Sequence, residues 1–216
     1  MYLSKLVLDP RYTYSYNIVN NPALLHSFVQ TRPFGTARKE HNVLFRLVKD
    51  NDRYILYVQS ETMPDWEPAL GQGIRLEAVR NTDKMKDLFK EGSAFGFSLM
   101  ANPVVSPVQD ENGHARSRAG NGVGPKRVFL ETRSDRLEWI KKLAAKNGFE
   151  IVWAQEKSAI PHRVRKKGNR EFVIGTVEFD GVLKITDRAL FEKAYREGIG
   201  RERAYGCGML MLHRAA

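Results

Sequence analysis

His26 is the residue of this sequence best suited to proton transfer, because an imidazole titrates near neutral pH and can donate or accept a proton. It lies in a stretch that predicts a short helix beginning at Asn21-Pro22. The apolar residues of that stretch recur at helical spacing: Leu24, Leu25, Phe28 and Val29. The alternative is a partly buried helix histidine that takes part in no reaction.

The sequence indicates neither a metal site nor a cofactor site. The other histidines show no HxH or HExxH spacing; they are His41, His114, His162 and His213. Cys207 is the single cysteine, which excludes an internal disulfide and a multi-cysteine zinc site. We therefore expect no bound metal and no cofactor.

A second unusual stretch runs from residue 197 to residue 208 and is rich in glycine: Gly198, Gly200, Gly206 and Gly208. Glycine lacks a Cβ, so its backbone adopts positive φ readily and its N–H groups can be approached closely. Arg201 and Arg203 lie inside the stretch, as cations that contact phosphate would. The spacing matches neither a P-loop nor a dinucleotide fingerprint. We interpret the stretch as a phosphate cradle, or alternatively as a helix C-cap followed by an ordinary loop.

Basic side chains gather in two further segments. Residues 161–170 predict a hairpin prong whose cations would meet RNA phosphates: Arg163, Arg165, Lys166, Lys167 and Arg170. Such a prong suits an A-form RNA stem, which is recognised by shape and phosphate position, and the alternative is a solvated loop. Residues 103–125 lack periodicity and carry Arg116 and Arg118, which predicts a basic arm or linker. No RNP-type aromatic signature is present, so base stacking in the manner of an RRM is not indicated.

The chain of 216 residues is basic, with 35 Lys and Arg against 25 Asp and Glu and a formal net charge of +10. This excess favours a polyanionic partner, most often nucleic acid, although an ordinary basic enzyme is the alternative. No apolar run approaches the length of a membrane span, and no signal peptide is evident. We expect a cytoplasmic protein.

The elements that must position these residues are expected to follow the order β-α-β-β-α-β twice. In the first half the predicted pieces are a strand at 3–8, a loop at 11–16, the helix with His26, a hairpin of strands 43–48 and 54–59, an extra short strand at 74–79, a helix after Thr82-Asp83 and a closing strand at 94–100. In the second half they are a strand at 126–131, a helix from Ser134, strands at 149–153 and 172–179, a two-residue turn at Asp180-Gly181, a strand at 182–185, a helix after Thr186-Asp187 and a last strand.

This order predicts an α+β fold of two tandem ferredoxin-like (RRM-like) domains. The expected boundaries are 1–103 for the domain with His26, 104–125 for a linker or basic loop, and 126–216 for the domain with the hairpin and the glycine-rich stretch. Two such sheets side by side would form a cleft. We expect the glycine-rich stretch and His26 to lie in different domains, distant from one another.

Several collinear segments resemble the CasE family, the CRISPR repeat-processing endoribonucleases of type I-E systems. These segments are residues 1–6 (MYLSKL), the helix with His26, Ala101-Asn102-Pro103, residues 177–183 (VEFDGVL), and Gly198-Ile199-Gly200 followed by residues 206–210 (GCGML). Together they span nearly the whole chain, and the C-terminal glycine pattern is the most specific.

The resemblance implies a metal-independent cut at the 3′ base of a repeat hairpin. A ribose 2′-OH attacks the adjacent phosphate, which leaves a 2′,3′-cyclic phosphate and a 5′-OH. The family histidine maps onto His26, as general acid or general base.

Family members often carry a tyrosine three residues before this histidine and a lysine five residues after it, and here those positions are Ala23 and Thr31. Another group must therefore orient the ribose and offset the charge that grows on the phosphorane. We expect Arg32 to supply the cation. We expect a tyrosine upstream of the helix to fold back as the hydroxyl donor, with Tyr16, Tyr14 and Tyr12 as the candidates.

The partners implied by the resemblance are CRISPR repeat RNA, the mature crRNA that stays bound, and the other subunits of the Cascade complex. The main alternative is a non-catalytic RNA-binding module of the same fold that protects or delivers crRNA. A DNA-binding regulator is not supported, because the predicted helices are separated by strands and are not paired by short turns.

Overall fold

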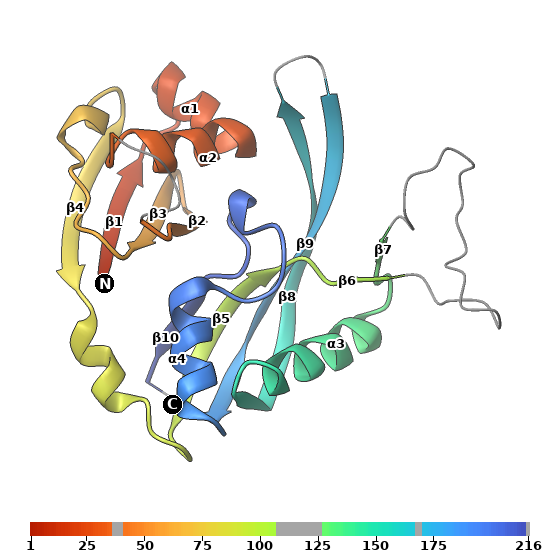
Figure 1. Ribbon diagram of the computed structural model, residues 1–216. Coiled ribbons are helices and arrows are strands. Elements are labelled where there is room, and N and C mark those ends of the chain that lie inside the picture. Colours follow the sequence, from red (N-terminus) through yellow and green to blue (C-terminus); the bar gives the residue numbers. More distant parts are fainter. Residues whose placement is uncertain (36–40, 107–126, 167–169, 215–216) are drawn as a thin grey trace.

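The computed structural model describes residues 1–35, 41–106, 127–166 and 170–214. It contains two four-stranded antiparallel sheets, each backed by helices on one face (Figure 1). The fold class predicted from the sequence, α+β with two ferredoxin-like units, is confirmed.

The first sheet has the strand order β2-β3-β1-β4. Its strands are β1 (Tyr2–Leu8), β2 (Leu44–Asp50), β3 (Arg53–Ser60) and β4 (Ile74–Asn81). The helices α1 (Thr13–Asn20) and α2 (Pro22–Thr31) pack on it through a core that includes Leu6, Phe28, Val29, Phe45 and Leu56. The hairpin expected at residues 43–59 is confirmed as β2 and β3.

The second sheet has the strand order β10-β5-β9-β8. Its strands are β5 (Ala94–Ala101), β8 (Phe149–Lys166), β9 (Arg170–Ile185) and β10 (Leu210–His213), and its helices are α3 (Arg133–Ala145) and α4 (Arg188–Glu197). Within each sheet, the fourth strand in the chain lies beside the first and the third lies between the first and the second. Both units therefore have the same ferredoxin-like topology.

One expected strand belongs to the other sheet. The strand predicted to close the first half, β5, pairs with β9 from Ala94 to Ala101 and with β10, so it opens the second sheet. The edge of the first sheet is instead β4, which was expected only as an extra strand. Alternating apolar residues predict a strand but not its partner, and Phe97 and Leu99 of β5 pack in the second core. Strand pairing therefore favours a boundary between β4 and β5 rather than at residue 103.

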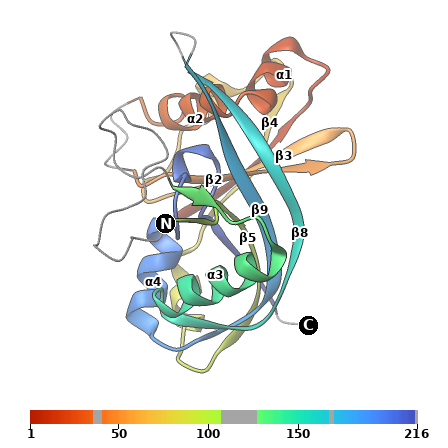
Figure 2. The same ribbon diagram turned by 90° about the vertical axis from the view of Figure 1, so that its right-hand side faces the viewer.

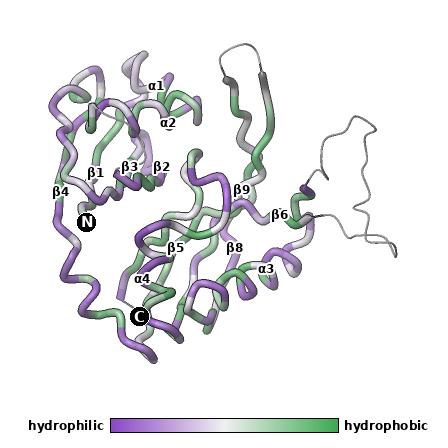
Figure 3. The backbone as a smooth tube through the Cα atoms, in the orientation of Figure 1, coloured by the Kyte–Doolittle hydropathy of each residue, from purple (hydrophilic) through white to green (hydrophobic). Residues whose placement is uncertain are grey.

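Three further expectations about local structure are wrong. The polar, aromatic segment upstream of α2 forms the helix α1 and not a loop. The helix expected after Thr82 is a 3₁₀ helix, η3 (Asp83–Leu88), in the largely hydrophilic connection between the two sheets (Figure 3). The strand expected at 126–131 is reduced to β7 (Val128–Phe129), which pairs with β6 (Val104–Val105) outside the main sheet.

The turn expected at Asp180-Gly181 is also wrong, because both residues lie inside the continuous strand β9. A Cβ on Gly181 would collide with the carbonyl oxygen of Trp153, at a shift in the β8–β9 register. The glycine is therefore required for close approach of the two strands rather than for a turn.

The long hairpin of β8 and β9 extends beyond the second sheet and runs alongside α2 of the first unit (Figures 1 and 2). This arrangement brings α2 into contact with β8 and with η4 (Arg203–Tyr205), a short 3₁₀ helix in the glycine-rich stretch. Among the residues that the structure describes, no helix is long and apolar enough to cross a bilayer.

Polar contacts fix the two units to one another at the end of α4. The buried side chain of Gln59 on β3 donates through Nε2 to the carbonyl oxygen of Tyr195 at 2.9 Å. Asn42 donates through Nδ2 to the carbonyl oxygen of Arg196 at 2.9 Å. The last carbonyls of a helix lack partners within the helix, so the first unit completes the hydrogen bonding of the second.

Candidate active site

The helix α2 holds His26 at the junction of the two units. Its first turn is fixed by Asn21, whose side chain accepts hydrogen bonds from the N–H groups of Ala23 and Leu24, with Pro22 at the first helical position. Leu25 and Phe28 are buried against the first sheet. His26 is turned by about 100° from Leu25 along the helix and is half-buried, which leaves its imidazole able to meet a ligand.

Tyr205 of the second unit lies beside this imidazole. The centroids of the His26 and Tyr205 rings are 6.1 Å apart, with their planes tilted by 54°. Tyr205 ends η4, so it belongs to the glycine-rich stretch. The expectation that this stretch and His26 are distant is therefore wrong, because the two form one site.

Sequence reasoning did not find Tyr205. It shares no local motif with His26, and the two residues are too far apart in the chain for a helical or strand period to relate them. The one available signal was its position among closely spaced glycines, where a fixed loop could present a side chain.

An aromatic row continues from Tyr205 into β9. The ring of Phe172 lies 5.8 Å from that of Tyr205, at an interplanar angle of 70°. His26, Tyr205 and Phe172 thus form a line of three rings that crosses from the first unit to the second.

The glycine-rich stretch is packed against protein, which corrects the prediction of an open cradle at two of its glycines. Gly206 and Gly208 are buried, and the N–H of Gly208 donates to the carbonyl oxygen of Met100 at 2.8 Å. A Cβ on Gly208 would lie 2.5 Å from the carbonyl oxygen of Ile199, and one on Gly206 would lie 3.3 Å from the ring of Phe45. These glycines allow the loop to pack closely, and they do not offer their N–H groups to phosphate.

Of the other residues of this stretch, some bond to the end of α4 and some are accessible to a ligand. The N–H of Gly198 donates to Ala194 at the end of α4, and Arg203 donates through Nη1 to the carbonyl oxygen of Glu197 at 2.5 Å. Gly198 and Arg203 therefore complete the C-terminus of the helix, as the alternative interpretation of this stretch expected. Arg201 is exposed and Gly200 is half-buried, so both remain candidates for contact with RNA.

A cavity of about 560 Å³ lies between the units and reaches Tyr205. At its wall, Arg46 of β2 donates through Nη2 to Glu178 Oε1 of β9 at 2.5 Å, which joins the two sheets by an ion pair whose arginine is buried and whose carboxylate is partly exposed. Burial lowers the pKa of Arg46, while the charges of Glu178 and Asp180 act in the opposite direction. An arginine stays charged even when it is buried beside carboxylates, so this ion pair holds the two units together by charge attraction.

Arg32 and Tyr16 are exposed. Arg32 follows the last turn of α2 and lines a cavity on another face of the helix, together with Tyr14 and Ser27. Arg32 lies six residues after His26, and each helical residue turns by about 100°. The two side chains therefore leave the helix in directions about 120° apart. The structure thus brings His26 together with Tyr205 rather than with Arg32.

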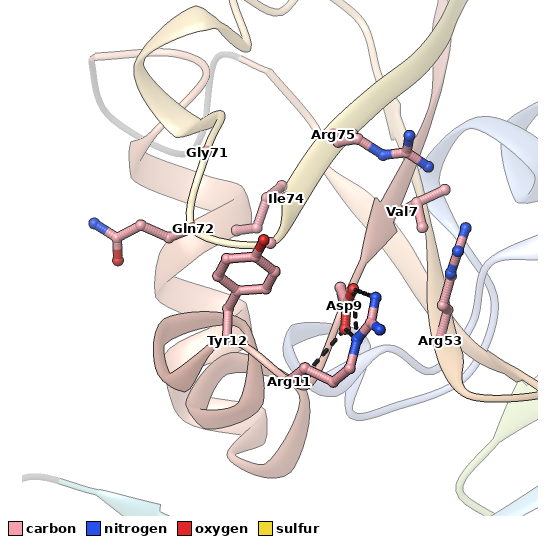
Figure 4. Close-up of a pocket in the computed structure, with 10 residues that line it drawn as sticks. Val7, Asp9, Arg11, Tyr12, Arg53, Gly71, Gln72, Ile74 and Arg75 are labelled. Carbon is pink, nitrogen blue, oxygen red and sulfur yellow. Dashed lines mark hydrogen bonds and ion pairs between the residues drawn. The ribbon is translucent and has the colours of Figure 1, made fainter.

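Tyr12 lies in a separate cavity at the end of β1 (Figure 4). Its side chain lies close to Gly73, where an added Cβ would meet it at 2.8 Å. The same cavity holds a pair between Arg11 and Asp9, with Arg11 Nη2 2.5 Å from Asp9 Oδ2. Hydrogen bonds from Arg11 lower the pKa of the Asp9 carboxyl to about 2. Tyr12 is exposed and lines this cavity, apart from the one that reaches Tyr205.

The predicted prong corresponds to the outer part of the β8–β9 hairpin, so its hairpin structure is confirmed. The backbone of this part includes Arg163, Arg165, Lys166 and Arg170, whose side chains lie outside the described part of the chain. Lys167 and the arm residues Arg116 and Arg118 also fall outside the described residues.

Among the residues that the structure describes, no group of three or more His, Cys, Asp or Glu side chains is arranged to hold a metal ion. Burial raises the pKa of the Cys207 thiol to about 12, so this thiol stays protonated at neutral pH and is a poor nucleophile. Of the groups described at the junction, His26 is the one whose ordinary pKa suits proton transfer.

The fold and the site define a tandem ferredoxin-like protein with a histidine at the junction of its units. A model of the family described as "CRISPR associated protein" matches residues 1–214, and the chain belongs to that family. The CRISPR-associated endoribonuclease Cse3 of Thermus thermophilus is 27% identical, over 97% of this chain and 98% of its own. The Cascade subunit CasE of Escherichia coli is 24% identical, over 74% and 80%. The predicted resemblance to the CasE family is thus confirmed.

The arrangement of the units is also found in a solved relative. The structure of Cse3 bound to a 19-nucleotide RNA superimposes with a TM-score of 0.82, at 24% identity, over 99% of this chain and all of the other. This likeness establishes the fold.

Proposed function

We propose that this protein is an endoribonuclease that binds CRISPR repeat RNA hairpins and cleaves precursor crRNA. The observation that carries the proposal is the contact of His26 with Tyr205, which builds an acid–base site from both units of the chain. The endoribonuclease Cse3 matches this chain over nearly its whole length, which supports the same activity.

The proposed reaction is an internal transfer at phosphorus. The ribose O2′ forms a bond to the adjacent phosphorus, the bond from phosphorus to O5′ breaks, and the products are a 2′,3′-cyclic phosphate and a 5′-OH. The 2′-OH loses a proton and the departing O5′ gains one. His26 performs one of these transfers, as general base or general acid.

Tyr205 is better placed than Tyr16 to supply the hydroxyl that contacts the phosphorane, because its ring already lies against His26. Arg32 remains the proposed cation from the sequence, and its long side chain must bend around the end of α2 to reach the same phosphate. Charge that develops on the phosphorane is stabilised most by donors that are already in position.

RNA binding is proposed along the β8–β9 hairpin and the accessible part of the glycine-rich stretch. The product stays bound, and the protein joins other Cascade subunits, as CasE of E. coli is a Cascade subunit by name. A cytoplasmic location is part of the same proposal.

The decisive experiment uses a repeat RNA, in EDTA, beside a copy with one 2′-deoxyribose on the 5′ side of the cleaved phosphate. We expect cleavage of the all-ribose RNA alone, with a 2′,3′-cyclic phosphate on the product. Cleavage of both RNAs would contradict the 2′-OH mechanism. Binding without cleavage of either would support the alternative, a non-catalytic module that protects or delivers crRNA.

A further inference from the structure

A second cavity, of about 450 Å³, lies where β9 leaves the second sheet. β5 pairs with β9 from Val177 to Lys184, whereas the described residues of β9 before Val177 are paired with β8 alone. The β6–β7 pair and the middle of the glycine-rich stretch line the other side of the cavity.

The walls of this cavity combine an aromatic face with positive charge. Phe172 lines it with 36% of its surface exposed, and Arg127 and Arg201 line it as exposed cations. In the described part of the chain, neither of these guanidinium groups makes an ion pair. Glu202 is the acid of this lining, and a carboxylate can accept hydrogen bonds from the amino group of a base.

The cavity adjoins the candidate active site through the aromatic row. Phe172 contacts Tyr205, and Tyr205 contacts His26. A chain of RNA that passes His26 can therefore continue along these rings into the cavity.

We propose that this cavity binds one unpaired nucleotide next to the cleaved phosphate, with its base on Phe172 and its phosphate held by Arg127 and Arg201. This inference rests on the proposed function. The volume lies in the range of about 300–1,000 Å³ that is common for small-molecule sites. The nucleotide must be unpaired, because a base inside a stem does not present its face to a side chain. Stacking of this kind needs no RNP motif and tolerates any base.

The aromatic contact is tested by binding, with a repeat RNA made uncleavable by a 2′-deoxyribose at the cut. Abasic nucleotides are placed one at a time on each side of that phosphate, and Phe172→Leu is compared with Phe172→Tyr. We expect Phe172→Leu to weaken binding of the intact RNA by roughly five- to a hundredfold. With the abasic nucleotide at the bound position, Phe172→Leu should have no further effect. Phe172→Tyr should bind as the parent does.

The phosphate contact is tested by the salt dependence of the same binding. Each contact to single-stranded RNA contributes about 0.7 to the slope of log K against log salt concentration. Arg127→Gln and Arg201→Gln should each reduce the slope by about this amount. Arg53→Gln is the matched control, because Arg53 is also an exposed arginine in a cavity lining but lies in the cavity of Figure 4. It should leave the slope unchanged.

Two results would overturn the subsite while leaving the proposed function intact. One is parental affinity of Phe172→Leu for the intact RNA. The other is an equal loss for the intact RNA and for every abasic RNA, which would show that Phe172 acts on the fold and not on a base. Failure of the parent protein to bind any repeat RNA would instead contradict the proposed function, and the subsite with it.

Discussion

At the scale of single residues, the candidate chemistry depends on an imidazole and a phenol from different units. The two rings lie 6.1 Å apart between centroids, and this contact depends on how the two units are joined. Two substitutions separate their contributions.

Replacement of His26 by Ala should nearly abolish cleavage. Loss of general acid–base catalysis costs roughly a hundred- to ten-thousandfold in rate. Affinity for repeat RNA should stay close to the parental value, because binding depends on many phosphate contacts elsewhere. Single-turnover cleavage and a binding titration check this, and a loss of affinity as large as the loss of rate would contradict the role.

Replacement of Tyr205 by Phe removes the hydroxyl and keeps the ring that lies against His26. We expect the cleavage rate at saturating enzyme to fall by roughly ten- to a thousandfold, because a single well-placed donor to a developing anion is of this order. Tyr16→Phe is the control, since Tyr16 is exposed on α1. If Tyr16→Phe shows the larger loss, the assignment made from the sequence is the correct one.

At the scale of elements, the glycine-rich loop acts as a rigid support. The N–H groups of Gly198 and Gly208 donate to α4 and β5, which fixes η4 and therefore Tyr205. Gly198 and Gly208 are needed because the loop approaches its neighbours there too closely for a Cβ.

Replacement of Gly208 by Ala tests this support. Gly208 has φ +86°, and its added Cβ would lie 2.5 Å from the carbonyl oxygen of Ile199. Gly92→Ala is the matched control, because Gly92 has φ +85° but no atom within 4 Å of the added Cβ. Backbone strain alone costs about 1–2 kcal/mol, so Gly208→Ala should lose clearly more free energy of unfolding than Gly92→Ala. It should also lower the cleavage rate; equal losses in urea unfolding would refute the packing role.

At the scale of the whole molecule, the two units are joined by buried and partly buried polar contacts as well as by the chain. The ion pair of Arg46 and Glu178 connects β2 to β9, and Gln59 connects β3 to the end of α4. The junction carries the site, so the stability of this interface and the activity are expected to change together.

Replacement of Arg46 by Ala leaves the Glu178 carboxylate without its partner. Removing one member of a fully buried pair costs about 3–5 kcal/mol. Glu178 is 25% exposed and can be partly hydrated, so we expect a smaller loss of about 1–3 kcal/mol. Lys142→Ala breaks the exposed pair with Glu138 on α3 and should cost at most about 0.5 kcal/mol. Urea unfolding measures both, and a loss for Arg46→Ala no larger than that of the control would contradict the connecting role.

The net charge of +10 predicts the response of RNA binding to salt. If about five or more phosphates are neutralised, log K should fall against log salt concentration with a slope steeper than about −3. A titration from low to moderate salt checks this, and a nearly flat dependence would contradict binding through the phosphates.

The types of most elements, the two-unit fold and the candidate histidine could be predicted from the sequence. Helical and alternating spacing predicted α2 and most strands, because side-chain burial repeats with the period of the element. The repeated element order predicted two ferredoxin-like units, and the chemistry of imidazole marked His26. The glycines of the stretch 197–208 marked a place where the backbone is closely approached.

The tertiary structure decided which strands pair and which residues meet. Local pattern predicted β5 as a strand but not its partners, since pairing is set by contacts far apart in the chain. It predicted a turn at Asp180-Gly181, where the glycine instead allows β9 to approach β8 closely. For the same reason the sequence placed the hydroxyl at Tyr16, near His26 in the chain, whereas packing of α2 against η4 brings Tyr205 there. A site made between two units depends on their docking, and docking leaves no period in the sequence.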